Sequence, residues 1–98
     1  MDDALKADLG RRLRRIEGQV AGVHRMVEEE RYCVEVLLQL ASVQSALGRV
    51  GTMTFEAHMQ TCVRDALLAG DPDRAQQKVD EAIEVLQRYS GLLCQAMR

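Results

Sequence analysis

Between residues 9 and 27 the apolar side chains recur at steps of four and three residues, which places them on one face of a helix. A half-buried strand would instead alternate apolar and polar residues, and we find no such run. The seam consists of Leu9, Leu13, Ile16, Val20, Val23 and Val27. Because heptad-like spacing is typical of helices that pack along other helices, we expect the first quarter of the chain to be one long helix with partner helices beside it.

A second, longer helix is predicted over residues 32–69. Gly48 and Gly51 are the candidate breaks within it, but neither is accompanied by a proline or a turn-forming residue. We interpret them as positions of close helix packing. No repeat or low-complexity segment interrupts the pattern, so the simplest prediction is an all-α fold of three helices.

The stretch "GDPD" at 70–73 predicts the end of the second helix and the start of the third. Glycine is common just past a helix C-terminus, which suits Gly70. Asp71 can cap the next helix through its side chain, and Pro72 fits the first helical position. The third helix is expected to fray after Gly91. Its expected buried residues are Val79, Ile83, Leu86 and Tyr89.

The composition narrows the class of protein. A chain of 98 residues suits one domain, residues 1–98, that gains from self-association. Two tyrosines, one phenylalanine and no tryptophan argue against binding single-stranded nucleic acid by base stacking. The start "MDDALKADLG" is not a secretory signal, and the longest uncharged run, 36–48, is too short and polar to span a bilayer. We therefore expect a cytoplasmic protein without membrane contact, whose three cysteines stay reduced.

A basic face lies opposite the apolar seam of the first helix. The net charge is −2, yet arginines crowd the first quarter of the chain. At about 100° per residue, the residues that fall on this face are Arg11, Arg14, Arg15, Gly18, Gly22 and Arg25. Two interpretations remain open. Either a phosphate-bearing partner approaches the backbone at the glycines, or the arginines are simply solvated and the glycines incidental.

His58 and Cys62 stand four residues apart in "HMQTC", on one face of the second helix. Their Cβ atoms would be about 5–6 Å apart, which suits two ligands of one metal ion. The nearest third ligand is Cys33, which on a continuous helix lies about 37 Å from His58. Breaking the helix at Gly51 would still leave Cys33 about 27 Å from the turn and the other two about 10–16 Å from it. If the three residues form one site, a second, antiparallel chain supplies the third ligand, and twofold symmetry gives two identical sites.

Two thiolates and one imidazole make a soft, three-coordinate donor set. Cu(I) prefers sulfur, whereas structural zinc takes four ligands and nickel or cobalt would want more nitrogen or oxygen donors. Copper(I) is therefore the predicted ligand, with zinc a lesser competitor. The alternative is that Cys33, His58 and Cys62 are ordinary core residues. No nucleophile–base pair or phosphate-binding loop is evident, so we do not expect an enzyme.

Two stretches carry a resemblance to a known family. "RRLRRIEGQVAGVHRMVEEERYCVEVLLQLASVQSAL" and the later "HMQTC" are similar to the CsoR/RcnR family of bacterial transcriptional repressors, and the similarity covers nearly the whole chain. The resemblance implies three-helix protomers that form an antiparallel four-helix-bundle dimer and a dimer-of-dimers tetramer, without a helix-turn-helix motif. It also implies that the unliganded protein binds double-stranded operator DNA and releases it when an inducer binds.

The ligand pattern resembles the copper(I)-sensing branch of that family. This branch uses a cysteine at the start of the second helix and His-x-x-x-Cys from across the dimer interface, which Cys33, His58 and Cys62 match. The nickel/cobalt branch has an N-terminal histidine and a further histidine in place of Cys62. The formaldehyde-responsive branch has a proline where Asp2 stands here, and persulfide sensors lack the histidine. The resemblance therefore implies a copper-responsive repressor of copper efflux or homeostasis genes.

The copper branch also has a tyrosine before the first cysteine and a glutamate on the third helix. Tyr32 and Glu81 are their expected counterparts. Their expected task is to hydrogen-bond the free N–H of the ligand histidine and so transmit its orientation.

DNA contacts in the family come from arginines on the first helix and one on the second. By this resemblance Arg12 and Arg49 match best, and Arg11, Arg15 and Arg25 are expected phosphate contacts. Two other functions stay open. One is a thiol-based persulfide or oxidant sensor of the same family, and the other is a copper buffer that does not bind DNA.

Overall fold

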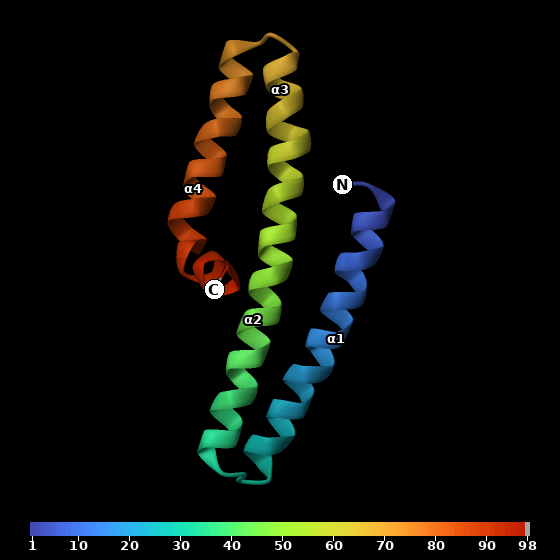
Figure 1. Ribbon diagram of the computed structural model, residues 1–98, viewed down its shortest axis with the longest axis vertical. Coiled ribbons are helices and arrows are strands. Elements are labelled where there is room, and N and C mark those ends of the chain that lie inside the picture. The colour runs from blue at the N-terminus through green and yellow to red at the C-terminus, as the bar shows by residue number, and fades with distance from the viewer. Residues whose placement is uncertain (98) are drawn as a thin grey trace.

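The computed structural model describes residues 1–97 and the side chains of residues 1–88. Within these residues the chain is helical and contains no strand, which confirms the all-α prediction. The elements are α1 (Asp3–Glu28), α2 (Cys33–His58), the π-helical segment η1 (Met59–Val63), α3 (Arg64–Leu68) and α4 (Pro72–Met97) (Figure 1).

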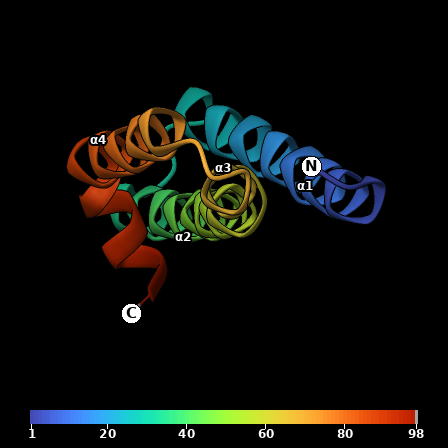
Figure 2. The same cartoon turned by 90° about the horizontal axis from the view of Figure 1, so that it is seen from above.

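Three long helical rods make up the molecule. The middle rod consists of α2, η1 and α3 in unbroken succession, and it runs antiparallel to α1 and to α4 (Figure 1). Viewed from above, α1 and α4 lie on different sides of α2 (Figure 2). The molecule is elongated, with principal extents of 57 × 28 × 20 Å. It therefore exposes far more of each helix than a compact bundle of the same length would.

The helix ends follow the local signals in the sequence. The side chain of Asp2 caps α1 by accepting a hydrogen bond from the backbone N–H of Leu5 at 2.7 Å. Gly70 has a φ of 72°, the left-handed conformation expected just past a helix C-terminus. Asp71 Oδ1 then accepts from the backbone N–H groups of Asp73 and Arg74 at 3.1 and 3.2 Å, so its predicted capping role is confirmed. Pro72 is the first residue of α4, as predicted.

The apolar seam of α1 is buried on one side and exposed on the other. Ile16 and Val23 are buried and form a core cluster with Val43 of α2. The alternate members of the seam are 41–58% exposed in the single chain. These are Leu13, Val20 and Val27. Hence α2 covers one side of the seam and leaves the other side open.

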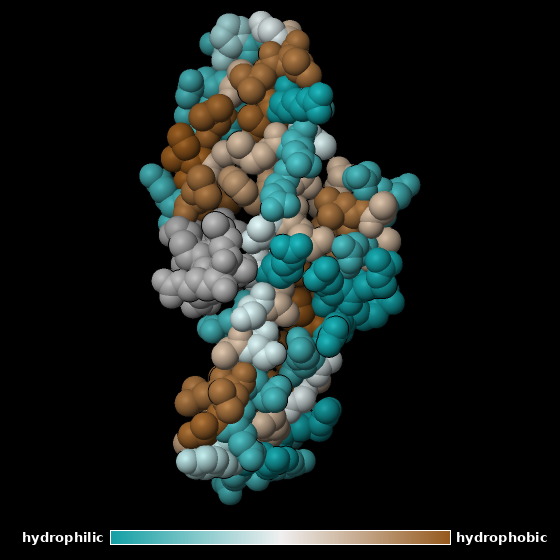
Figure 3. Space-filling model, viewed as in Figure 1, coloured by the Kyte–Doolittle hydropathy of each residue, from teal (hydrophilic) through white to brown (hydrophobic). Residues whose placement is uncertain are grey.

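The packing of α4 differs from the sequence prediction. Val79 is half-buried, Ile83 and Leu86 are 47% and 44% exposed, and among residues 72–88 the buried residue is Ala82. Tyr89 lies outside the residues whose side chains the structure describes. The expectation for Ile83 and Leu86 is thus wrong for the single chain. The apolar stripe of α4 is wider than the surface that one neighbouring rod can cover. Figure 3 shows brown apolar side chains gathered over α4 and the end of α3, and again at the lower end of α2.

The predicted extent of the second helix holds, with one correction to detail. Helical structure runs from Cys33 to Leu68, and Gly48 and Gly51 lie inside α2 without breaking it. However, residues 59–63 are π-helical, which the periodicity does not reveal. The prediction that the third helix frays after Gly91 is also wrong, since α4 continues to Met97. A glycine costs a helix only about 1 kcal/mol, which its neighbouring turns can offset.

Candidate metal centre

Two of the three predicted ligands lie on the same turn of the middle rod. His58 is the last residue of α2 and Cys62 belongs to η1. A π-helix has a wider turn, with i→i+5 hydrogen bonds, so Cys62 comes slightly less than one full turn after His58. In an α-helix it would come slightly more than one turn after it. His58 is half-buried and Cys62 is exposed, so both can be reached from outside the chain.

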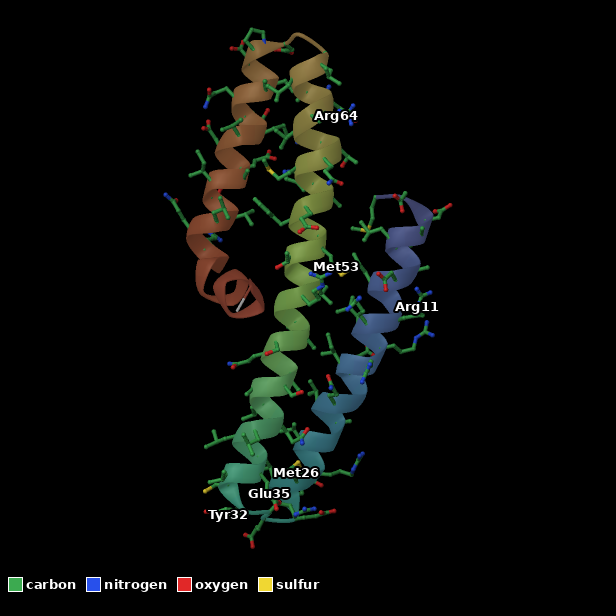
Figure 4. All side chains as sticks on the ribbon, in the orientation of Figure 1. Arg11, Met26, Tyr32, Glu35, Met53 and Arg64 are labelled. Carbon is green, nitrogen blue, oxygen red and sulfur yellow. The ribbon has the colours of Figure 1, made fainter. Side chains whose placement is uncertain are left out.

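The third predicted ligand is at the other end of the same rod. Cys33 is the first residue of α2 and is exposed. In Figure 4 Tyr32, its neighbour, and Arg64, which follows Cys62 by two residues, lie at opposite ends of the rod. Among the residues that the structure describes, no three His, Cys, Asp or Glu side chains gather into a group that could hold a metal ion. Within one chain, His58 and Cys62 are brought together and Cys33 is not.

The two residues expected to support the histidine are separated in the same way. Tyr32 is 67% exposed beside Cys33. Glu81 is half-buried on α4. Because α4 packs against η1, Glu81 belongs to the end of the molecule that holds Cys62. Its carboxylate Oε2 lies 3.4 Å from Nζ of Lys78. In one chain Glu81 is therefore paired with a lysine and remote from Tyr32.

The basic face of α1 is exposed, as predicted. Arg11 points away from α2 (Figure 4), and Arg25 is exposed as well. The guanidinium groups of Arg11 and Arg12 lie 3.7 and 3.3 Å from Oδ1 of Asp8. A Cβ atom built on Gly18 would meet nothing within 4 Å. Since packing inside the chain does not require a glycine there, any close approach would involve a partner.

The other arginines line two separate cavities. Arg12 and Arg15 border a cavity of about 210 Å³ between α1 and α2, whose polar lining also includes Gln19 and Ser42. Arg49 borders a cavity of about 310 Å³, which the start of α1 forms together with α2 and η1. The residues around this second cavity are Met1, Asp2, Leu5, Arg49, Met53, Glu56, Ala57, Gln60 and Thr61. The structure thus brings Arg12 and Arg15 together and places Arg49 closer to the candidate metal ligands.

The sequence interpretation missed Thr61. Its hydroxyl Oγ1 lies 2.6 Å from the carbonyl oxygen of Ala57 and 3.8 Å from Sγ of Cys62. A threonine directly before a candidate ligand is a signal that could have been noticed. The π-helical turn that sets these distances could not be read from the spacing.

Comparison with known proteins identifies the family. Residues 5–88 match the family described as metal-sensitive transcriptional repressor. The copper-sensing transcriptional repressor CsoR of Bacillus subtilis is 40% identical over 85 residues, which cover 87% of this chain and 81% of that protein. This chain therefore belongs to the metal-sensitive transcriptional repressor family, and the resemblance to the CsoR family is confirmed.

Two solved structures have a similar fold. The copper-sensing repressor CsoR with Cu(I) from Geobacillus thermodenitrificans superposes with a TM-score of 0.85 at 36% identity, covering 92% of this chain and 91% of that one. The nickel-responsive transcriptional regulator InrS superposes with a TM-score of 0.71 at 41% identity, covering 85% and 90%. Because identity to the nickel regulator is as high as to the copper repressors, the metal has to be argued from the donor set. None of the helices described here is long and apolar enough to cross a membrane.

Complementation between two ligand variants tests whether the site is shared. Neither Cys33→Ser nor Cys62→Ser alone leaves a complete site in a symmetric dimer. When the two variants are refolded together, half of the dimers are mixed, and each mixed dimer regains one complete site. We therefore expect the mixture to recover roughly a quarter of the wild-type content of tight Cu(I) sites, measured by chelator competition. No recovery on mixing would contradict a site that two chains share.

Proposed function

We propose that the chain is a copper(I)-responsive transcriptional repressor. The metal-free form binds operator DNA, and Cu(I) binding weakens that complex and so derepresses copper efflux or homeostasis genes. The observation that carries the proposal is the placement of three soft or borderline donors on one rod. His58 and Cys62 share a turn, and Cys33 is exposed at the far end, where a second antiparallel chain would meet it.

The donor set favours Cu(I) over the other metals. Two thiolates with one imidazole suit a soft ion of low coordination number, whereas Ni²⁺ commonly takes square-planar or octahedral nitrogen and oxygen donors. His24, the other histidine, lies on α1 with Nε2 3.0 Å from Oε1 of Glu28, away from η1. Zn²⁺ would need a fourth ligand. We propose Cu(I) as the regulatory ligand, with Zn²⁺ as a weaker competitor in vitro.

The exposed apolar surface supports assembly of several chains. Apolar side chains are exposed on the open side of the α1 seam, and leucines are exposed along α2 as well. These are Leu37, Leu38, Leu40 and Leu47. Burying apolar area stabilises an assembly by about 25 cal/mol per Å². Leucine side chains contribute a large apolar area when a partner chain covers them. We infer an antiparallel four-helix-bundle dimer made by α1 and α2 of two chains, and a dimer-of-dimers tetramer that uses the exposed side of α4.

Copper binding would be reported through the histidine. A metal-bound imidazole donates its second N–H to a neighbouring acceptor, which fixes the orientation of the ring. Tyr32 and Glu81 are the proposed partners. Tyr32 would come from the chain that supplies Cys33, and Glu81 from the chain that supplies His58 and Cys62. Glu81 pairs with Lys78 at 3.4 Å in the single chain, so contact with the histidine would replace this half-buried ion pair.

DNA binding would use the arginines of the exposed face of α1 and Arg49. Such contacts neutralise phosphates and release counterions, which makes the affinity dependent on salt. The proposed contacts are Arg11, Arg12, Arg15, Arg25 and Arg49. By linkage, DNA must weaken copper binding by the same factor by which copper weakens DNA binding. Such a protein is a regulator and not an enzyme, and it would work in the cytoplasm, where its thiols stay reduced.

A thiol-based sensor of persulfides or oxidants is the second candidate. The exposure of both Cys33 and Cys62 favours it, since accessible thiols are the ones that react. It differs from the copper proposal in having no use for His58. A copper buffer without DNA binding would instead leave the arginine face as solvated surface.

Operator release is the direct test of the function. Duplex DNA bound by the metal-free protein is selected from a random pool, and its affinity is measured by gel shift under reducing conditions. We expect one equivalent of Cu(I) per chain to weaken binding by about 5–150-fold, the usual range of allosteric coupling. Ni²⁺, Zn²⁺ and a persulfide donor serve as matched additions. Release by the persulfide donor alone would favour the thiol sensor, and the absence of any DNA complex would favour the buffer.

The variant His58→Ala separates binding from reporting. It keeps both thiolates, so we expect one Cu(I) per chain still to bind, while release of the operator becomes several-fold weaker because the oriented imidazole is lost. Copper content is measured by chelator competition and DNA release by gel shift on the same samples. Normal operator release by this variant would remove the histidine from the reporting step.

The variant Arg12→Ala tests whether α1 contacts DNA. Loss of one phosphate contact should weaken operator binding and reduce the slope of log K against log salt by about 1. Arg88→Ala is the matched control, because Arg88 is an exposed arginine on α4 that pairs with Glu84 at 3.4 Å. An unchanged slope for Arg12→Ala would place α1 outside the DNA interface.

A further inference from the structure

The hydroxyl of Thr61 lies beside the sulfur of the candidate ligand Cys62. Its Oγ1 lies 2.6 Å from the carbonyl oxygen of Ala57 and 3.8 Å from Sγ of Cys62. The first distance is a short hydrogen bond. The second is long for an oxygen acceptor, but it is within reach of the larger sulfur atom. One hydroxyl therefore contacts both the helix backbone and the candidate metal ligand.

The helix geometry at this point is unusual. Thr61 is the middle residue of η1, the π-helical segment that separates His58 from the α-helical residues of α3. Threonine hydroxyls that bond the carbonyl four residues earlier compete with the backbone ladder and bend helices. Short π-helical segments occur mostly as single turns, frequently at functional sites. The bond from Thr61 to Ala57 thus lies where the backbone departs from the α-helix, beside the candidate ligand.

We propose that Thr61 is a positioning residue for Cys62: its hydroxyl donates to the Ala57 carbonyl in the metal-free chain and orients the Cys62 sulfur by donating to it when it is a copper-bound thiolate. This inference rests on the proposed copper site. Partners of metal ligands fix the orientation of those ligands, and removing them typically costs 10–100-fold in metal affinity. We assign to Thr61 the role of orienting Cys62, just as the imidazole of His58 needs a partner that orients its ring.

The hydroxyl also has to choose between its two acceptors. A hydroxyl carries one proton and two lone pairs. A protonated thiol at Cys62 can donate to Oγ1 while Thr61 donates to Ala57. A metal-bound thiolate has no proton and can only accept, and a hydrogen bond to an ionised acceptor is roughly twice as strong as a neutral one. If Cys62 held Cu(I) as a thiolate, Thr61 would donate its single proton to the sulfur instead of to the Ala57 carbonyl.

This exchange connects the metal ligand to the rest of the helix. Once Thr61 donates to sulfur, the Ala57 carbonyl loses a side-chain donor within the turn that separates α2 from α3. Thr61 and Ala57 also border the cavity of about 310 Å³ that Arg49 and the start of α1 share. Thr61 thus lines the same cavity as Arg49, one of the proposed DNA contacts.

Three variants test the proposal in the full-length chain. Thr61→Val removes the hydroxyl and keeps the shape, and Thr61→Ser restores the hydroxyl. Thr54→Val is the matched control, because Thr54 makes the same kind of bond, to the carbonyl of Val50 at 2.8 Å, about two turns earlier and within the α-helix. Cu(I) affinity is measured by chelator competition, and the copper–thiolate charge-transfer absorption is recorded for each protein. The unfolding midpoint of each metal-free protein is measured in urea.

We expect Thr61→Val to bind Cu(I) about 10–100-fold more weakly and to shift the charge-transfer band, and Thr61→Ser to recover most of both. Thr54→Val should match the wild type in affinity and spectrum, while its urea midpoint moves by about as much as that of Thr61→Val. Wild-type affinity and spectrum in Thr61→Val, or failure of Thr61→Ser to recover them, would overturn the role of the hydroxyl while the copper proposal stands. A wild-type chain that does not bind Cu(I) would overturn both.

Discussion

A continuous helix cannot bring its own two ends together, and that constraint governs the candidate site. Cys33 begins the rod formed by α2, η1 and α3, and the pair His58 and Cys62 lies near its other end. At 1.5 Å per residue the separation is about 37 Å. The three donors can therefore act together only through an antiparallel second rod. In such a dimer, symmetry would make two equivalent sites, each with the same three donors.

The distribution of apolar residues also points to a second chain. A single hairpin of α1 and α2 covers half of the α1 seam, with Ile16 and Val23 inside and the alternate positions outside. The elongated molecule has too little core of its own to use the remaining leucines, valines and isoleucines. In the proposed assembly, the exposed apolar side chains and the exposed ligands would therefore meet the same partner chain.

Much of this could be predicted from the sequence because it depends on local rules. The apolar seam predicted α1. The boundary before α4 was predicted from Gly70, Asp71 and Pro72, because capping and backbone conformation depend on a few neighbouring residues. The exposure of Ile83 could not be predicted, because it depends on how much surface the neighbouring rod can cover. The π-helical turn was hidden for another reason. It changes the hydrogen-bond register by one residue, which periodicity over a long helix averages out.

A site divided between two chains also has a consequence for its dependence on concentration. A ligand that binds only the assembled form stabilises that form, so metal occupancy and subunit association reinforce one another. If Cys33 meets His58 and Cys62 only across an interface, the apparent copper affinity rises with the amount of the protein itself. Such a regulator would respond to the ratio between its own abundance and the metal, and dilution alone would lower its sensitivity.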